Sequence, residues 1–177
     1  MFRLLLALVL LLIVATVTAT DLPNRPVSTM ELSRYEGSWH EIAHIPVFYQ
    51  RRCTGPATAT YIPNGDGRLR VLTTCNTSRG LKSVDGVARY TSENPGAFKV
   101  RFAPDWLRWL PQAWIDYWVI DIDPDYHWAV IGEPGGSHLW IMSRNTLMSR
   151  RLYDELVARA RQRGYPVKKL VMMSTLY

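Results

Sequence analysis

The strongest constraint on this chain is a series of short segments in which apolar and polar side chains alternate with a period of two. Residues 97–102 (AFKVRF) are the clearest case, because Phe98, Val100 and Phe102 share one face while basic side chains occupy the other. Such alternation predicts a strand with one buried face. Seven further segments are predicted as strands, at residues 39–44, 57–62, 67–73, 84–90, 114–122, 127–132 and 138–143.

Turn-forming residues separate these segments. They occupy residues 63–67 (PNGDG), 93–96 (ENPG), 123–125 (DPD) and 133–136 (EPGG). Glycine, proline, asparagine and aspartate in such clusters favour tight turns between neighbouring strands. Eight strands at short, regular spacing predict an all-β fold, either an up-and-down barrel or a sandwich.

One helix and one more strand are expected after the eight strands. Leu152, Leu156 and Ala160 recur at helical spacing and form an apolar stripe, with Ser149 as the N-cap and Gly164 just past the C-terminus. The helix is therefore predicted over residues 149–163, and a short strand over residues 169–173 ends the chain.

The N-terminus has the pattern of an export signal. A basic start is followed by an apolar run and by small residues, which predicts a signal peptide at residues 1–19. The alternative is a membrane anchor, but the run of about 11 apolar residues is shorter than the roughly 20 that span a bilayer. The expected division is a signal at 1–19, a leader at 20–29 and one domain at 30–177. The protein is expected to be periplasmic or secreted, and any association with the outer membrane is expected to occur without a lipid anchor.

The two cysteines are predicted to pair. Cys53 and Cys75 both follow the signal, and an even number of cysteines in an oxidising compartment favours a disulfide over two buried thiols. The net charge of +6 favours contact with anionic surfaces such as lipid head groups. Several arginines fall within 150–163 and are interpreted as the solvated face of the helix, so nucleic acid is not expected as a partner.

The segment 39–44 (WHEIAH) contains the zinc-protease string H-E-x-x-H. That motif needs a helix, because only there do His40 and His44 share a face closely enough to bind one ion. In a strand the two residues are about 13 Å apart, and Pro46 disfavours helical backbone before it. No third ligand follows at the expected spacing. The string is interpreted as a strand without a metal, and zinc protease activity through His40, Glu41 and His44 is the alternative.

Three short motifs give the chain a resemblance to the lipocalins, and within them to the bacterial Blc-type and apolipoprotein D-like branch. The motifs are Gly37-x-Trp39 at the first strand, Asp125-Tyr126 in the turn between the sixth and seventh strands, and Arg144 at the end of the eighth. The resemblance implies an eight-stranded antiparallel up-and-down barrel with one C-terminal helix packed outside. It further implies that Trp39 plugs a closed end and that Arg144 lies across its indole.

The resemblance also implies a cavity for a small hydrophobic ligand, with a dry, filled core as the alternative. The alternation then provides the candidate inward-facing residues. These are Tyr61, Val84, Tyr90, Phe98, Val100, Phe102, Trp114, Trp118, Ile120, Trp140 and Met142. Glu41 shares the phase of Trp39, so a carboxylate is expected in the interior, where it needs a partner.

The segment 104–114 (PDWLRWLPQAW) is unusually rich in tryptophan for a connection between strands. Its apolar residues are Trp106, Leu107, Trp109 and Leu110. They are predicted to form a membrane contact or a lid over the cavity, with self-packing as a third reading.

The hypothesis is a non-enzymatic protein, without cofactor, that binds fatty acids or lysophospholipids for lipid maintenance in the cell envelope. It is expected to be a monomer or weak dimer. A membrane-surface protein acting through segment 104–114 is the alternative.

Overall fold

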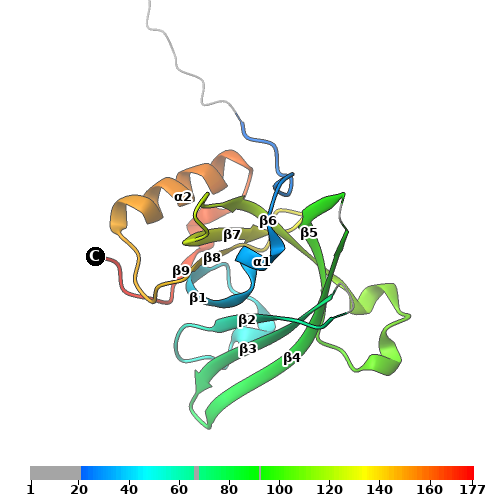
Figure 1. Ribbon diagram of the computed structural model, residues 1–177. Helices are drawn as coiled ribbons and strands as arrows, with labels where there is room; N and C mark the ends of the chain where they lie inside the picture. Colours follow the sequence, from blue (N-terminus) through cyan, green and yellow to red (C-terminus); the bar gives the residue numbers. More distant parts are fainter. Residues whose placement is uncertain (1–20, 66–67, 92) are drawn as a thin grey trace, which may run out of the picture.

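The computed structural model describes residues 21–65, 68–91 and 93–177. The predicted signal peptide lies outside these residues. The described part of the chain forms a nine-stranded antiparallel sheet in the order β2-β3-β4-β5-β6-β7-β8-β1-β9 (Figure 1). Strand β2 also pairs with β1, and this pairing closes the first eight strands into a barrel. The predicted barrel is thereby confirmed, and the sandwich alternative is excluded.

The strands follow the predicted order. Their bounds are β1 (Gly37–His44), β2 (Thr58–Pro63), β3 (Arg68–Thr77), β4 (Gly80–Thr91), β5 (Asn94–Arg101), β6 (Ile115–Ile122), β7 (Trp128–Gly132), β8 (Trp140–Ser143) and β9 (Val171–Met172). The helices are α1 (Leu32–Tyr35), α2 (Arg150–Gln162) and the 3-10 turns η1 (Phe48–Gln50), η2 (Asp105–Leu107), η3 (Pro111–Ala113) and η4 (Val167–Lys169). Strand β9 is shorter than the predicted 169–173, and the first of those residues, Lys169, belongs to η4.

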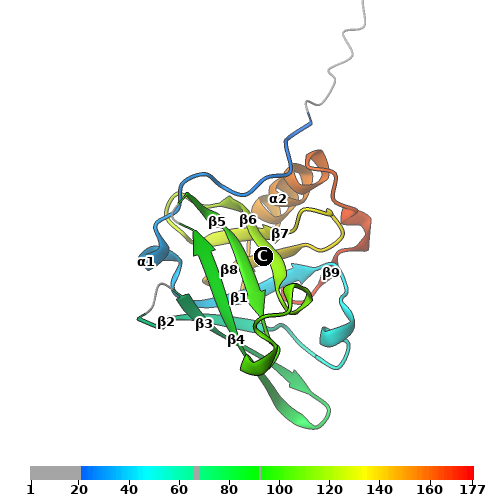
Figure 2. The same ribbon diagram turned by 90° about the vertical axis from the view of Figure 1, so that its right-hand side faces the viewer.

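The antiparallel order divides the connections between two ends of the barrel. Helix α1 and the turns β2–β3, β4–β5 and β6–β7 lie at one end, the closed end. Turn η1, the β3–β4 hairpin, the β5–β6 loop with η2 and η3, and the β7–β8 loop lie at the other, the open end. In Figure 2, α1 is on the left, while η1 (cyan) and the β3–β4 hairpin are on the right.

Trp39 and Arg144 seal the closed end as predicted. The Trp39 side chain is fully buried, and the Arg144 guanidinium lies 3.9 Å from the centre of its ring. The indole Nε1 of Trp39 donates to the carbonyl of Tyr35 at 2.8 Å. Gly37 has φ +87°, and a Cβ there would stand 3.3 Å from Arg144 Nη1. Glycine is therefore favoured at this position by backbone conformation and by space.

The core has two parts, one inside the barrel and one outside it. The inner part contains Trp39, Leu69, Phe98 and Val119 among others. The outer part lies between the β6–β8 wall and α2, and Leu156 and Ala160 of the predicted stripe are buried there. Burial of this apolar stripe stabilises a helix that is otherwise strongly basic.

The predicted helix caps are both present. Ser149 Oγ accepts from the backbone N–H of Leu152 at 3.3 Å, and Gly164, just past the C-cap residue Arg163, has φ +88°. The N-cap bond satisfies one backbone donor of the first turn. The left-handed glycine ends the helix without steric cost.

Residues 21–31 form a strap along the outside of the barrel. The Leu22 N–H donates to Gln162 O at 3.0 Å, and the Val27 N–H donates to Val119 O at 2.8 Å. The Tyr165 hydroxyl donates to Asn24 Oδ1 at 2.8 Å. The strap thus connects α2 and β6 to the closed end.

Arg144→Lys is expected to lower the free energy of unfolding by about 1–3 kcal/mol. The arginine donates to the carbonyls of Ser38 at 2.9 Å and Arg34 at 2.6 Å while it covers Trp39, and a lysine cannot make both contacts from one planar group. Urea unfolding followed by tryptophan fluorescence measures the change. The matched control is Arg161→Lys on the exposed face of α2. An equal effect of the two substitutions would contradict the stabilising role of Arg144 at the closed end.

Candidate ligand cavity

A cavity of about 470 Å³ lies inside the barrel toward the open end. Its walls are mainly apolar and aromatic. They include Ala57, Ala59, Tyr61, Val71, Val84, Val100, Phe102, Tyr117, Trp140 and Met142, together with Phe48, Tyr49 and Gln50 of η1. Volumes of 300–1,000 Å³ with few polar groups are usual for sites that bind small molecules.

The structure brings many of the predicted residues together at this cavity. Tyr61, Val84, Val100, Phe102, Trp140 and Met142 line it. Phe98 is fully buried below the cavity and stacks on Tyr35, while Tyr90 packs edge-on against Phe98. Phe98 and Tyr90 therefore support the floor rather than line the space above it.

The predicted orientation of Trp118 and Ile120 is wrong. Both belong to the outer cluster under α2, and the inward residues of β6 are Tyr117 and Val119. Both faces of β6 carry large apolar residues because the outer one is covered by the helix, and Asp116 and Asp121 fall on opposite phases, so alternation alone could not choose between the faces. Trp114 does not line the cavity either; its ring lies 4.0 Å from the guanidinium of Arg89.

The segment after β1 contributes cavity residues that the sequence analysis missed. Phe48, Tyr49 and Gln50 lie in η1, which follows Pro46 and has no strand periodicity. The Cys53–Cys75 disulfide ties this segment to β3, and both cysteines line the cavity, which confirms the predicted pairing. The predicted pairing of Cys53 with Cys75 was the signal that could have found these residues, since it places the segment before Cys53 beside the third strand.

Three tyrosines form the polar part of the floor. The Tyr61 hydroxyl donates to the Tyr117 hydroxyl at 2.6 Å, and the Tyr35 ring lies 5.0 Å from the Tyr61 ring. Burial raises the pKa of Tyr117 to about 12 and the pKa values of Tyr35 and Tyr61 well above their usual range. All three remain protonated near neutral pH and can donate hydrogen bonds.

Glu41 is the buried carboxylate of the cavity wall, and its partners are now visible. One oxygen, Oε2, accepts from the Ala57 N–H at 3.0 Å and from Gln50 Nε2 at 3.1 Å. The other, Oε1, is in direct contact with His44 Nδ1. Gln50 Oε1 accepts from the Trp140 indole at 3.1 Å, so the glutamine links β1 to β8.

A β-bulge explains why Glu41 meets His44. The register of β1 against β8 shifts between Glu41 and Ala43, so that Glu41 pairs with Met142 and His44 pairs with Trp140. The extra residue, Ile42, packs in the outer cluster. The bulge turns His44 inward beside Glu41. His40, on the outward-facing side of β1, bonds Thr58 at 3.2 Å.

The strand reading of H-E-x-x-H is confirmed by this geometry. The two histidines of the motif project to opposite faces of β1 and do not converge. Among the described residues there is no group of three or more His, Cys, Asp and Glu side chains that could hold a metal ion.

The segment 104–114 lies beside the mouth at the open end. Trp106 and Trp109 are each 72% exposed, while Leu107 and Leu110 are partly buried. None of the four lines the cavity. The loop folds as η2 and η3, and Arg101 anchors its start by donating to Ala103 O and to Asp105 Oδ1, each at 2.5 Å.

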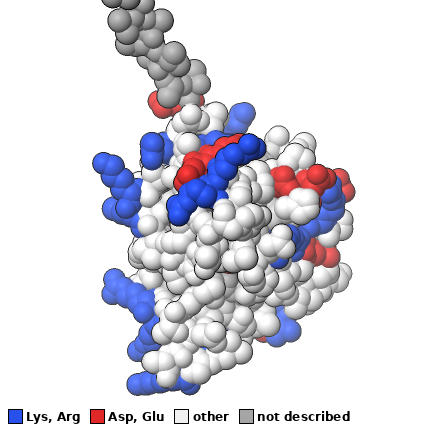
Figure 3. Space-filling model, turned by 90° about the vertical axis from the view of Figure 1, so that its left-hand side faces the viewer, with Lys and Arg blue, Asp and Glu red and all other residues white. Residues whose placement is uncertain are grey.

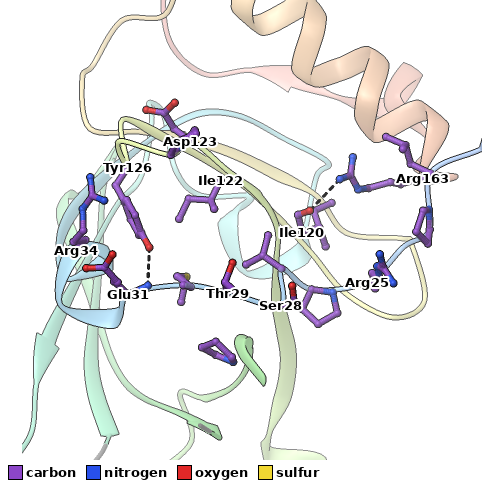
Figure 4. A pocket seen from close by; sticks show the side chains of 17 residues that line it. Arg25, Ser28, Thr29, Glu31, Arg34, Ile120, Ile122, Asp123, Tyr126 and Arg163 are labelled. Atoms are coloured by element: carbon purple, nitrogen blue, oxygen red, sulfur yellow. Dashed lines mark hydrogen bonds between the residues drawn. The ribbon is translucent and has the colours of Figure 1, made fainter. Parts of the chain in front are cut away.

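A second, more open cavity of about 910 Å³ lies between the strap and the closed end (Figure 4). Glu31 and Arg34 lie at one side of this view, and Arg25 and Arg163 at the other. The Glu31 N–H donates to the Tyr126 hydroxyl at 2.6 Å. The charged side chains that line this second cavity are dispersed along it and do not converge on one point.

The fold and the cavity define a class: a small β-barrel that receives an apolar molecule through one end. The sequence model described as a lipocalin-like domain matches residues 30–175. The chain belongs to the lipocalin family, whose members bind small hydrophobic ligands. This agrees with the three motifs around Gly37, Tyr126 and Arg144.

Named relatives support the same placement. The chain is 38% identical to temperature-induced lipocalin-1 of Arabidopsis thaliana over 147 residues, covering 81% of this chain and 78% of the relative. It is 31% identical to the outer membrane lipoprotein Blc of Escherichia coli K12 over 163 residues, covering 88% of each. Insecticyanin of the tobacco hornworm Manduca sexta superimposes with a TM-score of 0.64 at 16% identity, covering 89% and 88%. Across the described residues, no helix has the length and apolar character needed to cross a membrane.

Replacement of Cys53 and Cys75 by serine together is expected to lower the free energy of unfolding by about 3 kcal/mol. The disulfide joins residues 22 positions apart and holds η1 against β3, so its loss frees the unfolded chain and loosens one wall of the cavity. Chemical denaturation with and without reductant measures the effect. Reductant should destabilise the native protein and leave the double variant unchanged; sensitivity of the variant to reductant would contradict the prediction.

Proposed function

We propose that this protein binds, and stores or carries, a single-chain lipid of the fatty acid or lysophospholipid class in lipid maintenance of the cell envelope. The observation that carries the proposal is the apolar cavity of about 470 Å³ at the open end. An acyl chain would lie against Val71, Val100 and Met142, where each buried methylene contributes about 0.8 kcal/mol. The proposal includes export to the cell envelope. It is supported by the relative Blc, whose name describes an outer membrane lipoprotein.

Ala59→Phe is expected to weaken lipid binding by roughly tenfold or more, because the ring would occupy volume that the acyl chain needs. Ala59 lines the cavity, whereas Ala158 is exposed on α2, so Ala158→Phe is the matched control. Titration of a fatty acid or a lysophospholipid, followed by quenching of tryptophan fluorescence, gives the affinities. Native mass spectrometry shows which lipids co-purify. If neither lipid class binds the wild-type protein, the proposed function fails.

A second candidate function, docking of the open end on an anionic membrane, has its own observation. Exposed apolar side chains project from three separate segments at this end: Phe48 is 77% exposed, Leu81 71%, and Trp106 and Trp109 72% each. Basic residues accompany them on the same segments. These are Arg51, Arg52, Arg79 and Arg108. At the bottom of Figure 3, where the β3–β4 hairpin lies, basic side chains are prominent and the visible acidic ones lie mainly higher up.

This combination fits a lipid interface. Tryptophan is favoured at the level of the head groups, and basic residues next to it are attracted to anionic lipid. Docking in this orientation would place the mouth of the cavity on the membrane surface, so the two functions are compatible.

Trp106→Ala with Trp109→Ala is expected to abolish most binding to phosphatidylglycerol vesicles while leaving lipid uptake from solution intact, because neither tryptophan lines the cavity. Vesicle co-sedimentation measures the loss. Tyr177→Ala removes an aromatic ring that is 77% exposed and away from the open end, and serves as the control. Unchanged sedimentation of the double variant, or equal binding to neutral phosphatidylcholine vesicles, would rule out this docking mode.

A further inference from the structure

We propose that the cavity selects lipids with a neutral, hydrogen-bond-donating head group, such as a hydroxyl, over free carboxylates, and that Glu41 is the selecting residue. This inference rests on the proposed function, since it concerns which lipid the same cavity accepts. It goes further by assigning the discrimination to one side chain.

The position of Glu41 is the first argument. Its side chain is 1% exposed, yet it lines the cavity. A carboxylate offers about four acceptor positions. The Ala57 N–H and Gln50 Nε2 occupy two of them on Oε2, while Oε1 touches His44 Nδ1 and accepts no hydrogen bond. Glu41 lines the cavity and His44 does not, so a ligand in the cavity meets the carboxyl group rather than the imidazole.

The charges around the cavity are the second argument. Glu41, Asp116 and Glu133 line it, whereas Lys82 is the single lysine or arginine among the described lining residues. Lys82 Nζ donates to the backbone carbonyl of Tyr49 at 2.9 Å, at the open end. A carboxylate head group beside Glu41 would thus face a like charge, which is unfavourable in a partly dry cavity, while the one lining lysine is bound to a backbone carbonyl.

Gln50 adds a donor beside this acceptor. Its Oε1 accepts from the Trp140 indole, which fixes the amide orientation so that Nε2 points to Glu41. An amide nitrogen carries two hydrogens, and one remains available to a ligand. A hydroxyl can donate to Glu41 and accept from Gln50 at the same time. An ionised carboxylate can only accept.

Glu41 also acts on cavity residues from two other elements. Burial is the main cause of the raised pKa values of Tyr49 and Tyr117, and the charge of Glu41 contributes to both. The two tyrosines lie on different elements, η1 and β6, and both line the cavity. The carboxylate therefore influences the region that a ligand head group would occupy.

The test compares three ligands that share one acyl chain: oleyl alcohol, oleate and methyl oleate. They are titrated into the wild-type protein below their aggregation concentrations, at alkaline pH so that oleate is ionised, and quenching of tryptophan fluorescence is recorded. Oleyl alcohol is expected to bind at least about tenfold more tightly than oleate, with methyl oleate in between because it is neutral but has no donor.

Glu41→Gln keeps the shape and removes the charge, and it is expected to reduce the preference for oleyl alcohol over oleate by about tenfold. Glu155→Gln, on the exposed face of α2, removes one carboxylate outside the barrel and should leave the preference unchanged. The wild-type comparison needs no variant, so the proposal remains testable if Glu41→Gln does not fold.

The outcomes separate this inference from the function on which it rests. Binding of all three ligands with equal affinity, or tighter binding of oleate, would overturn the selection by Glu41 and leave lipid binding in place. A preference for oleyl alcohol that persists undiminished in Glu41→Gln would overturn the role of that residue. If none of the three binds, the proposed function fails, and the inference fails with it.

Discussion

The contact between Arg144 and Trp39 is the interaction on which the interior of this barrel depends. The guanidinium covers the indole at 3.9 Å and donates to the carbonyls of Arg34 and Ser38. One side chain thereby joins the end of β8 to α1 and β1. Because this end is sealed and its floor is filled by stacked aromatic rings, the remaining space opens toward η1 and the β3–β4 hairpin. The composition of that open end then governs what can approach the cavity.

The second constraint is the bulge in β1. A regular strand would alternate Glu41 inward, Ile42 outward, Ala43 inward and His44 outward. The extra residue keeps Ile42 in the apolar layer under α2 and returns His44 to the inner face. A single register shift therefore serves two needs. It completes the outer core, and it places the His44 imidazole against one oxygen of the buried Glu41 side chain.

Strand order, the disulfide, the helix with its caps and the closed end could all be predicted from the sequence, because each depends on local pattern or on a unique pairing. The inward face of β5 was predictable because Lys99 and Arg101 mark the other face. In β6 the polar residues Asp116 and Asp121 fall on opposite phases of the alternation, so they do not decide between Trp118 and Tyr117, and the outcome depends on where α2 packs. The role of Gln50 required the tertiary contact between η1, β1 and β8. The partner of Glu41 required the bulge, which no local signal announces.

Strand β1 has a consequence for how the chain folds. Within the described residues it pairs with β2, its neighbour in sequence, and with β8 and β9, which come near the end of the chain. The barrel cannot close until the last third of the chain has been added, and pairing between such distant segments is slow. Until then one side of β1 is an unpaired edge beside the apolar residues Trp39 and Ile42. An incomplete chain thus exposes a segment prone to aggregation, and its efficient folding depends on protection of that edge.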